Sequence, residues 1–184
     1  MKSLSLILLL VLTLVPSLGR AADSPDYLSL GGGGYDFDKD QDRRKSVDYR
    51  IEYEWGTSLL PLIDSSFNSV EPFIQMHPTL GFEGNSRGAV FGNGGLNFDV
   101  PFLRHGIFTW GEALGAFDPG HDPRPLGAIL EFRSQLELGW QFDNKLRLTG
   151  FISHISNAHI LSDDPGAEIV GAYVHIPLSG WKQK

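Results

Sequence analysis

The segment Val47-Asp-Tyr-Arg-Ile-Glu-Tyr-Glu-Trp55 decides the fold class, because it alternates strictly between apolar and charged residues. Each odd position carries an aliphatic or aromatic side chain, and each even position carries a charge. Successive side chains of a β-strand point to opposite faces, so the pattern predicts a strand with one apolar and one charged face. Strands of transmembrane barrels have this pattern, since one face contacts lipid and the other lines the interior.

The same alternation recurs elsewhere in the chain. In 128–141, Glu131, Arg133, Gln135 and Glu137 alternate with apolar residues, which are Leu130, Phe132, Leu136, Leu138 and Trp140. The predicted strands are 27–37, 47–55, 70–81, 88–100, 107–117, 128–141, 146–156 and 168–178, separated by segments rich in Asp, Asn, Pro and Gly. The segment 56–69 is less clear and is compatible with a short helix. We therefore predict an all-β protein, an eight-stranded antiparallel transmembrane β-barrel of the outer membrane.

The amino-terminal segment has the pattern of a secretory signal. Lys2 precedes an apolar run over 4–15, and Gly19-Arg20-Ala21 provides a small-x-small cleavage site. We predict a signal peptide over 1–21, with cleavage after Ala21 or Ala22, and a barrel domain over 22–184. The apolar run is too short for a confident transmembrane helix, and no later run is long enough. A membrane protein of this sequence must therefore cross with strands.

Composition excludes several kinds of function. The chain has no cysteine, so disulfides and thiolate metal sites are unavailable. The net charge of −7 argues against a nucleic-acid partner.

The segment Gly150-Phe-Ile-Ser-His-Ile-Ser-Asn-Ala158 carries the candidate chemistry. His154 and Ser156 are two residues apart and would lie on the same face of a strand. The following 157–167 contains Pro165-Gly166 and is predicted to be a loop, after which Glu168 opens the next strand. An antiparallel return brings Glu168 back to the pair, which is the arrangement of a serine-hydrolase triad.

These three residues lie on the more apolar face of their strands. Leu148, Gly150 and Ile152 share the parity of His154, and Val170 and the alternating residues after it share the parity of Glu168. In a membrane barrel that face contacts lipid, so an active site there implies a lipid substrate. With both chain ends in the periplasm, the 157–167 loop is expected to be extracellular and the site to lie at the level of the outer leaflet.

The segment His154-Ile-Ser156-Asn157-Ala158 through Asp164-Pro165-Gly166-Ala-Glu168, followed by Tyr173 and Ile176-Pro177-Leu178, resembles the PagL family of outer-membrane lipid A 3-O-deacylases. The resemblance covers roughly the last forty residues, and before them only the barrel pattern is shared. It implies an eight-stranded barrel that removes the acyl chain esterified at the 3-position of lipid A, without metal or other cofactor. It also implies that Ser156 is the nucleophile, His154 the general base and Glu168 its orienting acid, facing the outer leaflet.

The donors of the oxyanion hole are the point of departure from the family pattern. Where the family has an asparagine that helps to form the hole, this chain carries Asp164. A carboxylate opposes a developing oxyanion unless it is protonated or turned away. His159 replaces a small residue, although its backbone N–H remains available as a donor. The candidates are therefore Asn157, His159 and Asp164.

Two other functional classes stay open at this stage. The first is a non-enzymatic outer-membrane barrel with a structural or adhesive role, in which the His-x-Ser sequence is inert. The second is a soluble lipid-binding barrel. The chain ends on Lys184 rather than on the aromatic residue usual for such barrels. The sequence does not distinguish a monomer from a homodimer, and it does not reveal the preferred acyl chain. The other histidines show no metal-like clustering and are expected on the surface or in the lumen.

Overall fold

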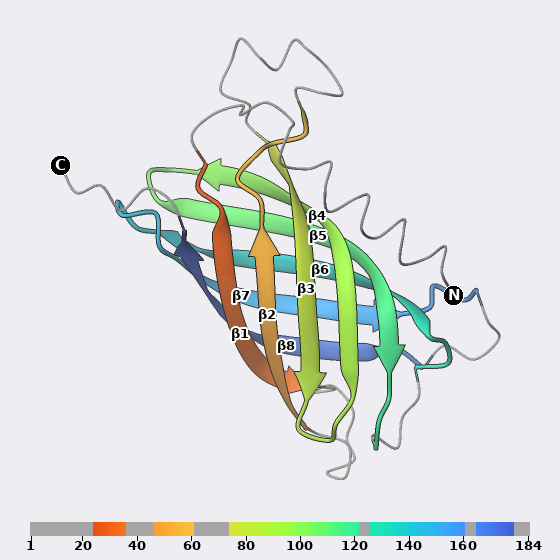
Figure 1. Cartoon of the computed structure of the whole chain (residues 1–184). Helices are drawn as coiled ribbons and strands as arrows, with labels where there is room; N and C mark the ends of the chain where they lie inside the picture. Colours follow the sequence, from red (N-terminus) through yellow and green to blue (C-terminus); the bar gives the residue numbers. More distant parts are fainter. Residues whose placement is uncertain (1–23, 36–45, 61–73, 122–125, 161–164, 179–184) are drawn as a thin grey trace.

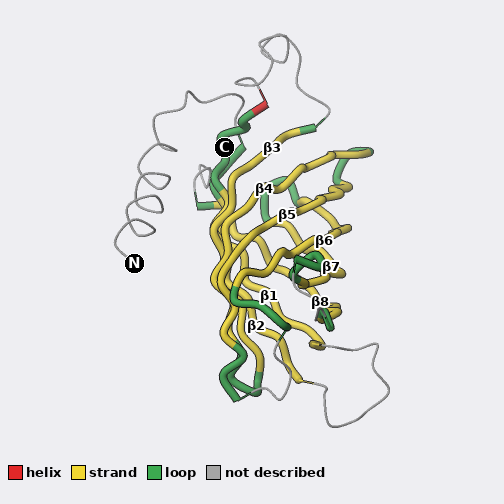
Figure 2. The backbone as a smooth tube through the Cα atoms, turned by 90° about the vertical axis from the view of Figure 1, so that its right-hand side faces the viewer, coloured by secondary structure: helices red, strands yellow, loops and turns green. Residues whose placement is uncertain are grey.

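The computed structural model describes residues 24–35, 46–60, 74–121, 126–160 and 165–178. They form eight β-strands: β1 Tyr27–Tyr35, β2 Ser46–Glu54, β3 Gln75–Asn85, β4 Val90–Phe102, β5 Gly106–Asp118, β6 Leu130–Gln141, β7 Arg147–Ser156 and β8 Ala167–Pro177. Each strand pairs with its neighbours in sequence, and β1 pairs antiparallel with β8 to close the barrel (Figure 1). The predicted fold, an eight-stranded antiparallel barrel, is confirmed. The tilted strands curve into the barrel wall in the rotated view (Figure 2).

The third strand extends past its predicted end. We expected 70–81, with Gly81 as its end, whereas β3 runs from Gln75 to Asn85. It continues past Gly81 because Phe82 and Glu83 keep the alternation and pair with both β2 and β4. The turn comes only at Gly88, whose φ of +90° favours glycine and whose N–H donates to Asn85 O at 3.0 Å.

Several predictions fall wholly or partly outside the described residues. These are the signal peptide over 1–21, the beginning and end of the domain at 22–23 and 179–184, and most of the unclear segment 56–69. The same holds for residues 36–37 of the first predicted strand, 70–73 of the third, and 161–164 of the predicted loop. They remain predictions. No helix among the described residues is long and apolar enough to cross a membrane.

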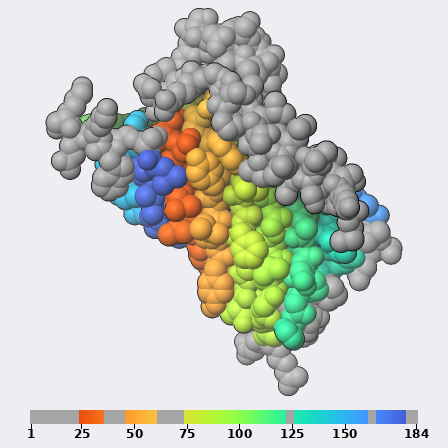
Figure 3. Space-filling model, in the orientation of Figure 1, coloured from red at the N-terminus to blue at the C-terminus, as the bar shows by residue number. Residues whose placement is uncertain are grey.

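The two faces of the strands differ as the alternation requires. In β2, Val47 is 52% exposed and Ile51 46%, whereas Arg50 is 4% exposed. In β6, Leu138 is 61% exposed and Arg133 only 1%. The apolar side chains therefore point outward and the charged side chains fill the lumen. In the space-filling view, β1 to β5 form a continuous wall on the face shown (Figure 3).

Buried charges in the lumen are matched by opposite charges. A cluster that we call the lumenal ion network contains Asp48, Arg50, Glu52, Glu83 and Arg133. Arg50 Nε lies 2.6 Å from Asp48 Oδ2, and Arg133 Nη2 lies 2.6 Å from Glu52 Oε2. Glu83 joins the two halves, because it forms ion pairs with both arginines. The network connects β2, β3 and β6 across the barrel interior.

The barrel has two distinct ends. The chain enters β1 and leaves β8 at one end, which we call the terminal end. The β1–β2, β3–β4, β5–β6 and β7–β8 connections lie at the other, which we call the loop end and which lies toward the lower right of Figure 1. The position of an outward residue within its strand therefore gives its distance from the terminal end and from the loop end.

The depth of an outward residue is expected to set the cost of placing a charge there. Leu148 is the second residue of β7 and lies near the terminal end. Ile51 lies near the middle of β2. We expect Ile51→Arg to cost about 2–4 kcal/mol of folding free energy, and Leu148→Arg about 0–1 kcal/mol.

Urea titration of both variants in phospholipid vesicles would measure this difference. An Ile51→Arg protein as stable as the Leu148→Arg protein would show that the outward face of β2 does not contact the hydrocarbon core.

Candidate active site

His154 and Glu168 form a hydrogen-bonded pair on the outer wall of the barrel. They are directly opposite each other in the β7–β8 ladder, and His154 Nδ1 lies 2.6 Å from Glu168 Oε1. Both side chains point outward: that of His154 is 46% exposed and that of Glu168 32%. A carboxylate accepts a hydrogen bond from Nδ1–H, and this tautomer of the neutral ring leaves Nε2 as a proton acceptor.

Ser156 is the last residue of β7 and lies on the same outward face as His154. It is half-buried, whereas the intervening Ile155 and the preceding Ser153 point into the barrel. The Ser156 hydroxyl makes no hydrogen bond to the His154 ring in this structure. Two residues along a strand span roughly 6.5–7 Å, so the serine rotamer decides whether the hydroxyl reaches the ring. Such catalytic hydrogen bonds are often loose until substrate binds.

Gly166 packs against the histidine ring, a contact that the sequence did not reveal. It has a φ of +57°, and a methyl group at its Cα would lie 2.9 Å from His154 Cε1 and 3.5 Å from Nε2. Only glycine fits there without displacing the ring, and only glycine adopts this φ without strain. Gly166 thus holds one side of the imidazole while Glu168 holds Nδ1.

The three candidates for the oxyanion hole lie in different places. The Asn157 side chain is fully buried, and its Nδ2 donates to Leu126 O at 3.3 Å, so this amide points into the barrel and away from the lipid-facing pair. His159 is exposed in a turn where Ile160 N donates to Asn157 O at 3.1 Å. Asp164 lies outside the described residues.

The turn after Ser156 has an unusual backbone. Ala158 and His159 have φ of 54° and 59°, the left-handed region that is unfavourable for residues with a Cβ. These two strained residues follow the nucleophile candidate after one intervening residue, Asn157. They fix the direction in which the backbone and its N–H groups leave β7.

A second Ser-His-Glu group lies inside the lumen and offers a comparison. His175 Nδ1 lies 2.7 Å from Ser29 Oγ, and its Nε2 lies 3.1 Å from Glu137 Oε2. All three residues are buried, so no ester can approach them. The two groups therefore differ in exposure, because His154 and Glu168 are accessible on the outer wall and the lumenal group is not.

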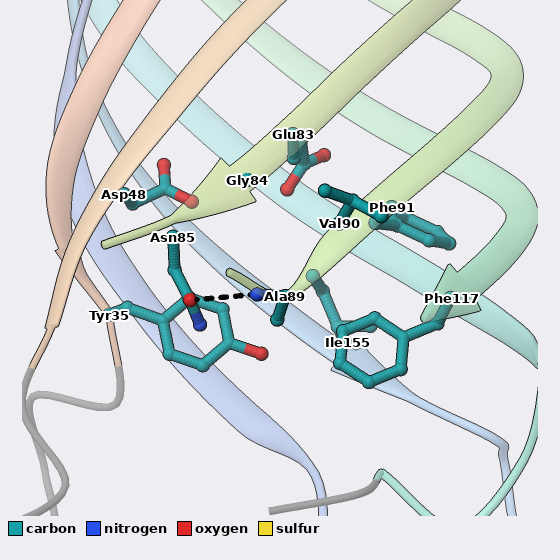
Figure 4. A pocket seen from close by; sticks show the side chains of 10 residues that line it. All are labelled: Tyr35, Asp48, Glu83, Gly84, Asn85, Ala89, Val90, Phe91, Phe117 and Ile155. Carbon is teal, nitrogen blue, oxygen red and sulfur yellow. Dashed lines mark hydrogen bonds between the residues drawn. The ribbon is translucent and has the colours of Figure 1, made fainter. Parts of the chain in front are cut away.

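A small cavity at the loop end of the lumen is also separate from the outward residues. Its lining residues include Asp48, Glu83, Phe91 and Ile155 (Figure 4). Asn85 and Ala89 also line it, and the Ala89 N–H donates to Asn85 Oδ1. Ile155 stands between His154 and Ser156 in sequence but points to the opposite side of the wall. The catalytic candidates therefore face the lipid and not this cavity. Among the residues that the structure describes, no three histidines or carboxylates are grouped so as to hold a metal ion.

The contact between Gly166 and His154 leads to a prediction. We expect Gly166→Ala to displace the imidazole and to lower kcat roughly 10- to 100-fold, because a misplacement of about 1 Å can cost that much. KM should change little, since the substrate-binding wall is untouched. Steady-state kinetics of ester hydrolysis would measure both constants.

Ala158→Gly is the matched control, because it also changes one methyl group in a left-handed residue but relieves strain. Wild-type kcat in the Gly166→Ala protein would show that Gly166 does not position the histidine.

Comparison with known proteins agrees with the barrel fold. The family model for lipid A 3-O-deacylase (PagL) matches residues 29–177. Among solved structures, the crystal structure of the outer membrane enzyme PagL superposes with a TM-score of 0.61 at 17% sequence identity, covering 83% of this chain and 99% of that one. A de novo designed transmembrane β-barrel gives a TM-score of 0.53 at 8% identity, covering 86% of this chain and 100% of the design. No curated protein matches at the sequence level.

Proposed function

Because this chain belongs to the lipid A 3-O-deacylase (PagL) family, a family of outer-membrane β-barrels, we propose that it hydrolyses the ester-linked acyl chain at the 3-position of lipid A, using Ser156, His154 and Glu168. The observation that carries the proposal is the 2.6 Å contact between His154 and Glu168 on the lipid-facing wall. A polar pair is costly on a surface that contacts hydrocarbon, so its presence there calls for a function.

The chemistry follows from the tautomer that Glu168 favours. His154 Nε2 accepts the proton of Ser156 Oγ as the oxygen attacks the ester carbonyl. Collapse of the tetrahedral intermediate breaks the bond to the sugar oxygen, which takes the proton from Nε2 and leaves as a hydroxyl group, and an acyl group remains on Ser156. Water, deprotonated in turn by His154, then attacks the acyl group and releases the fatty acid.

Glu168 orients the ring and stabilises the imidazolium that forms in both steps. Its effect is larger in an apolar environment than in water, because little solvent screens the charges. Gly166 contributes by keeping the ring from turning. The proposal requires no metal or cofactor.

The orientation of the barrel belongs to the same proposal. His154, Ser156 and Glu168 all lie near the loop end, within a few residues of the β7–β8 connection. If the loop end faces outward, this places them beside the outer leaflet, where lipopolysaccharide and its lipid A anchor are found. A substrate ester at the boundary between sugar and acyl chains would then reach Ser156 without leaving the membrane.

Mass spectrometry of lipid A tests this function. Lipid A from cells that express the protein should lose the mass of one ester-linked acyl chain, and lipid A from cells with an empty vector should not. Unchanged lipid A, with a correctly folded protein in the outer membrane, would support the alternative of a non-enzymatic barrel.

Asp164 provides a separate prediction about the oxyanion hole. If its carboxylate takes the position of the family's asparagine, Asp164→Asn replaces a charge that opposes the oxyanion by an amide that donates to it. One such donor is worth on the order of 100- to 1,000-fold in rate, so we expect kcat to rise in this variant.

Asp163→Asn is the matched control, because it makes the same exchange at the neighbouring residue. If position 164 alone takes the place of the family's asparagine, Asp163→Asn should leave kcat within about twofold. A fall in kcat for Asp164→Asn would show that the carboxylate itself contributes to the reaction.

A further inference from the structure

A row of polar residues crosses the outer wall from β8 to β5. Glu168 pairs with His154, His154 pairs with Ser134 on β6, and Ser134 pairs with Glu112 on β5. Directly opposite residues on adjacent strands have Cβ atoms about 4.5–5.5 Å apart and point to the same face. The catalytic pair is therefore one half of a continuous row of four polar side chains.

The second half of the row is internally hydrogen-bonded. Ser134 Oγ donates to Glu112 Oε2 at 2.8 Å, and Trp110 Nε1 donates to Glu112 Oε1, also at 2.8 Å. A carboxylate has about four lone-pair positions, so the two oxygens of Glu112 can each accept one more hydrogen bond. The Ser134 hydroxyl can also accept while it donates.

The polar row differs from the outward face of the other half of the barrel wall. On β1 to β4, the outward residues that the structure describes within the strands are glycine, proline or hydrophobic. The outward positions of β2, for example, are Val47, Tyr49, Ile51 and Tyr53. A carboxylate on this surface costs free energy, and residues that serve only the fold would be apolar there.

The position of Glu112 along the strand indicates which part of a lipid it meets. Glu168 and His154 lie near the loop end, whereas Glu112 is the central residue of β5. Glu112 is also two strands away from Ser156, which corresponds to roughly 10 Å across the wall. A lipid whose ester reaches Ser156 therefore brings acyl chains, and not its sugar, to Glu112. The acyl chain that meets Glu112 is therefore a neighbour of the acyl chain whose ester is cleaved.

We propose that Glu112 and Ser134 form a subsite on the lipid-facing wall that accepts a hydrogen bond from a hydroxyl group on a second acyl chain of the bound lipid. This inference rests on the proposed function and names a specificity determinant for it. In hydrocarbon no water satisfies the remaining acceptor positions of Glu112, so a hydroxylated chain is bound in preference to an unsubstituted one. Trp110 holds the carboxylate in place from the side away from Ser134.

The test compares two substrates that differ only in these hydroxyl groups. Purified protein in detergent micelles is given lipid A with hydroxylated acyl chains, or a synthetic analogue in which hydrogen replaces the acyl hydroxyls. The wild-type protein is expected to favour the hydroxylated lipid by about tenfold or more in kcat/KM, because a buried charged acceptor left without its donor is penalised. In Glu112→Leu this ratio should fall to about one, mainly through KM.

Leu114→Ala is the matched control, since Leu114 is the next outward residue on β5 and carries no polar group. It should keep the wild-type ratio. Glu112→Gln keeps one acceptor oxygen and should give an intermediate ratio.

The outcomes separate this inference from the proposed function. A wild-type protein that deacylates both lipids equally, or a Glu112→Leu protein that keeps the preference, would overturn the subsite and leave the esterase intact. A wild-type protein that cleaves neither lipid would overturn both.

Discussion

Replacing Ser156 by alanine is expected to lower lipid A deacylation by about 10⁴-fold or more, because the variant has no nucleophile to form the acyl-enzyme. His154→Ala should cause a loss of similar size, since the two residues act as one unit. Glu168→Ala should leave more activity, because Glu168 orients the ring but does not itself react. Release of fatty acid from purified lipid A, measured by mass spectrometry, gives all three rates.

A serine and a histidine whose side chains point into the lumen provide controls for Ser156 and His154. Ser153 lies three residues before Ser156 but points into the lumen, where its hydroxyl accepts a hydrogen bond from Arg50 at 3.0 Å. His175 belongs to the buried Ser-His-Glu group. Ser153→Ala and His175→Ala should therefore retain deacylation. Loss of activity in His175→Ala, with a folded barrel, would point to the lumenal group as the reactive one.

Breaking the lumenal ion network by removing one of its charges is expected to destabilise the barrel strongly. Arg133→Leu removes the cation that pairs with Glu52 and Glu83. The three buried carboxylates of the network, Asp48, Glu52 and Glu83, are then left with Arg50 as its remaining cation. Leaving a buried charge without its partner typically costs about 3–5 kcal/mol. We expect a loss of that size in the free energy of unfolding, measured by urea titration in lipid vesicles.

Arg104→Leu is a suitable control, because Arg104 is exposed in the turn between β4 and β5. Its effect should stay within about 0.5 kcal/mol. If Arg133→Leu were equally mild, the lumenal carboxylates would have to be satisfied by some other group.

The fold was readable from the sequence because its signal is local. The two-residue alternation around Arg50 and Ile51 states which side chain points outward, and the structure confirms that direction. The end of the third strand was predicted too early, at Gly81. In the structure, pairing with β2 and β4 extends the strand to Asn85. Strand ends depend on neighbours that local sequence does not reveal.

Part of the candidate site was readable for the same reason. His154 and Ser156 share a face by parity, and one hairpin brings Glu168 opposite His154. The contact of Gly166 with the ring was not readable, because it depends on the φ of one loop residue.

The row from His154 through Ser134 to Glu112 was also hidden in the sequence. It depends on the registers of β5, β6 and β7, which are set by pairing between strands and shift the facing residues whenever a loop changes length. The inward direction of the Asn157 amide likewise follows from tertiary packing against Leu126.

The central claim, that Ser156 is a nucleophile facing the lipid, is tested most directly by covalent trapping. A long-chain alkyl fluorophosphonate, delivered in detergent micelles, reacts with an activated serine and marks it with a stable mass increase. We predict that peptide mapping finds one modified residue, Ser156, and that His154→Ala suppresses the labelling while Ser153→Ala does not. Labelling at another serine, or deacylation by a protein whose Ser156 has been replaced by alanine, would contradict the mechanism.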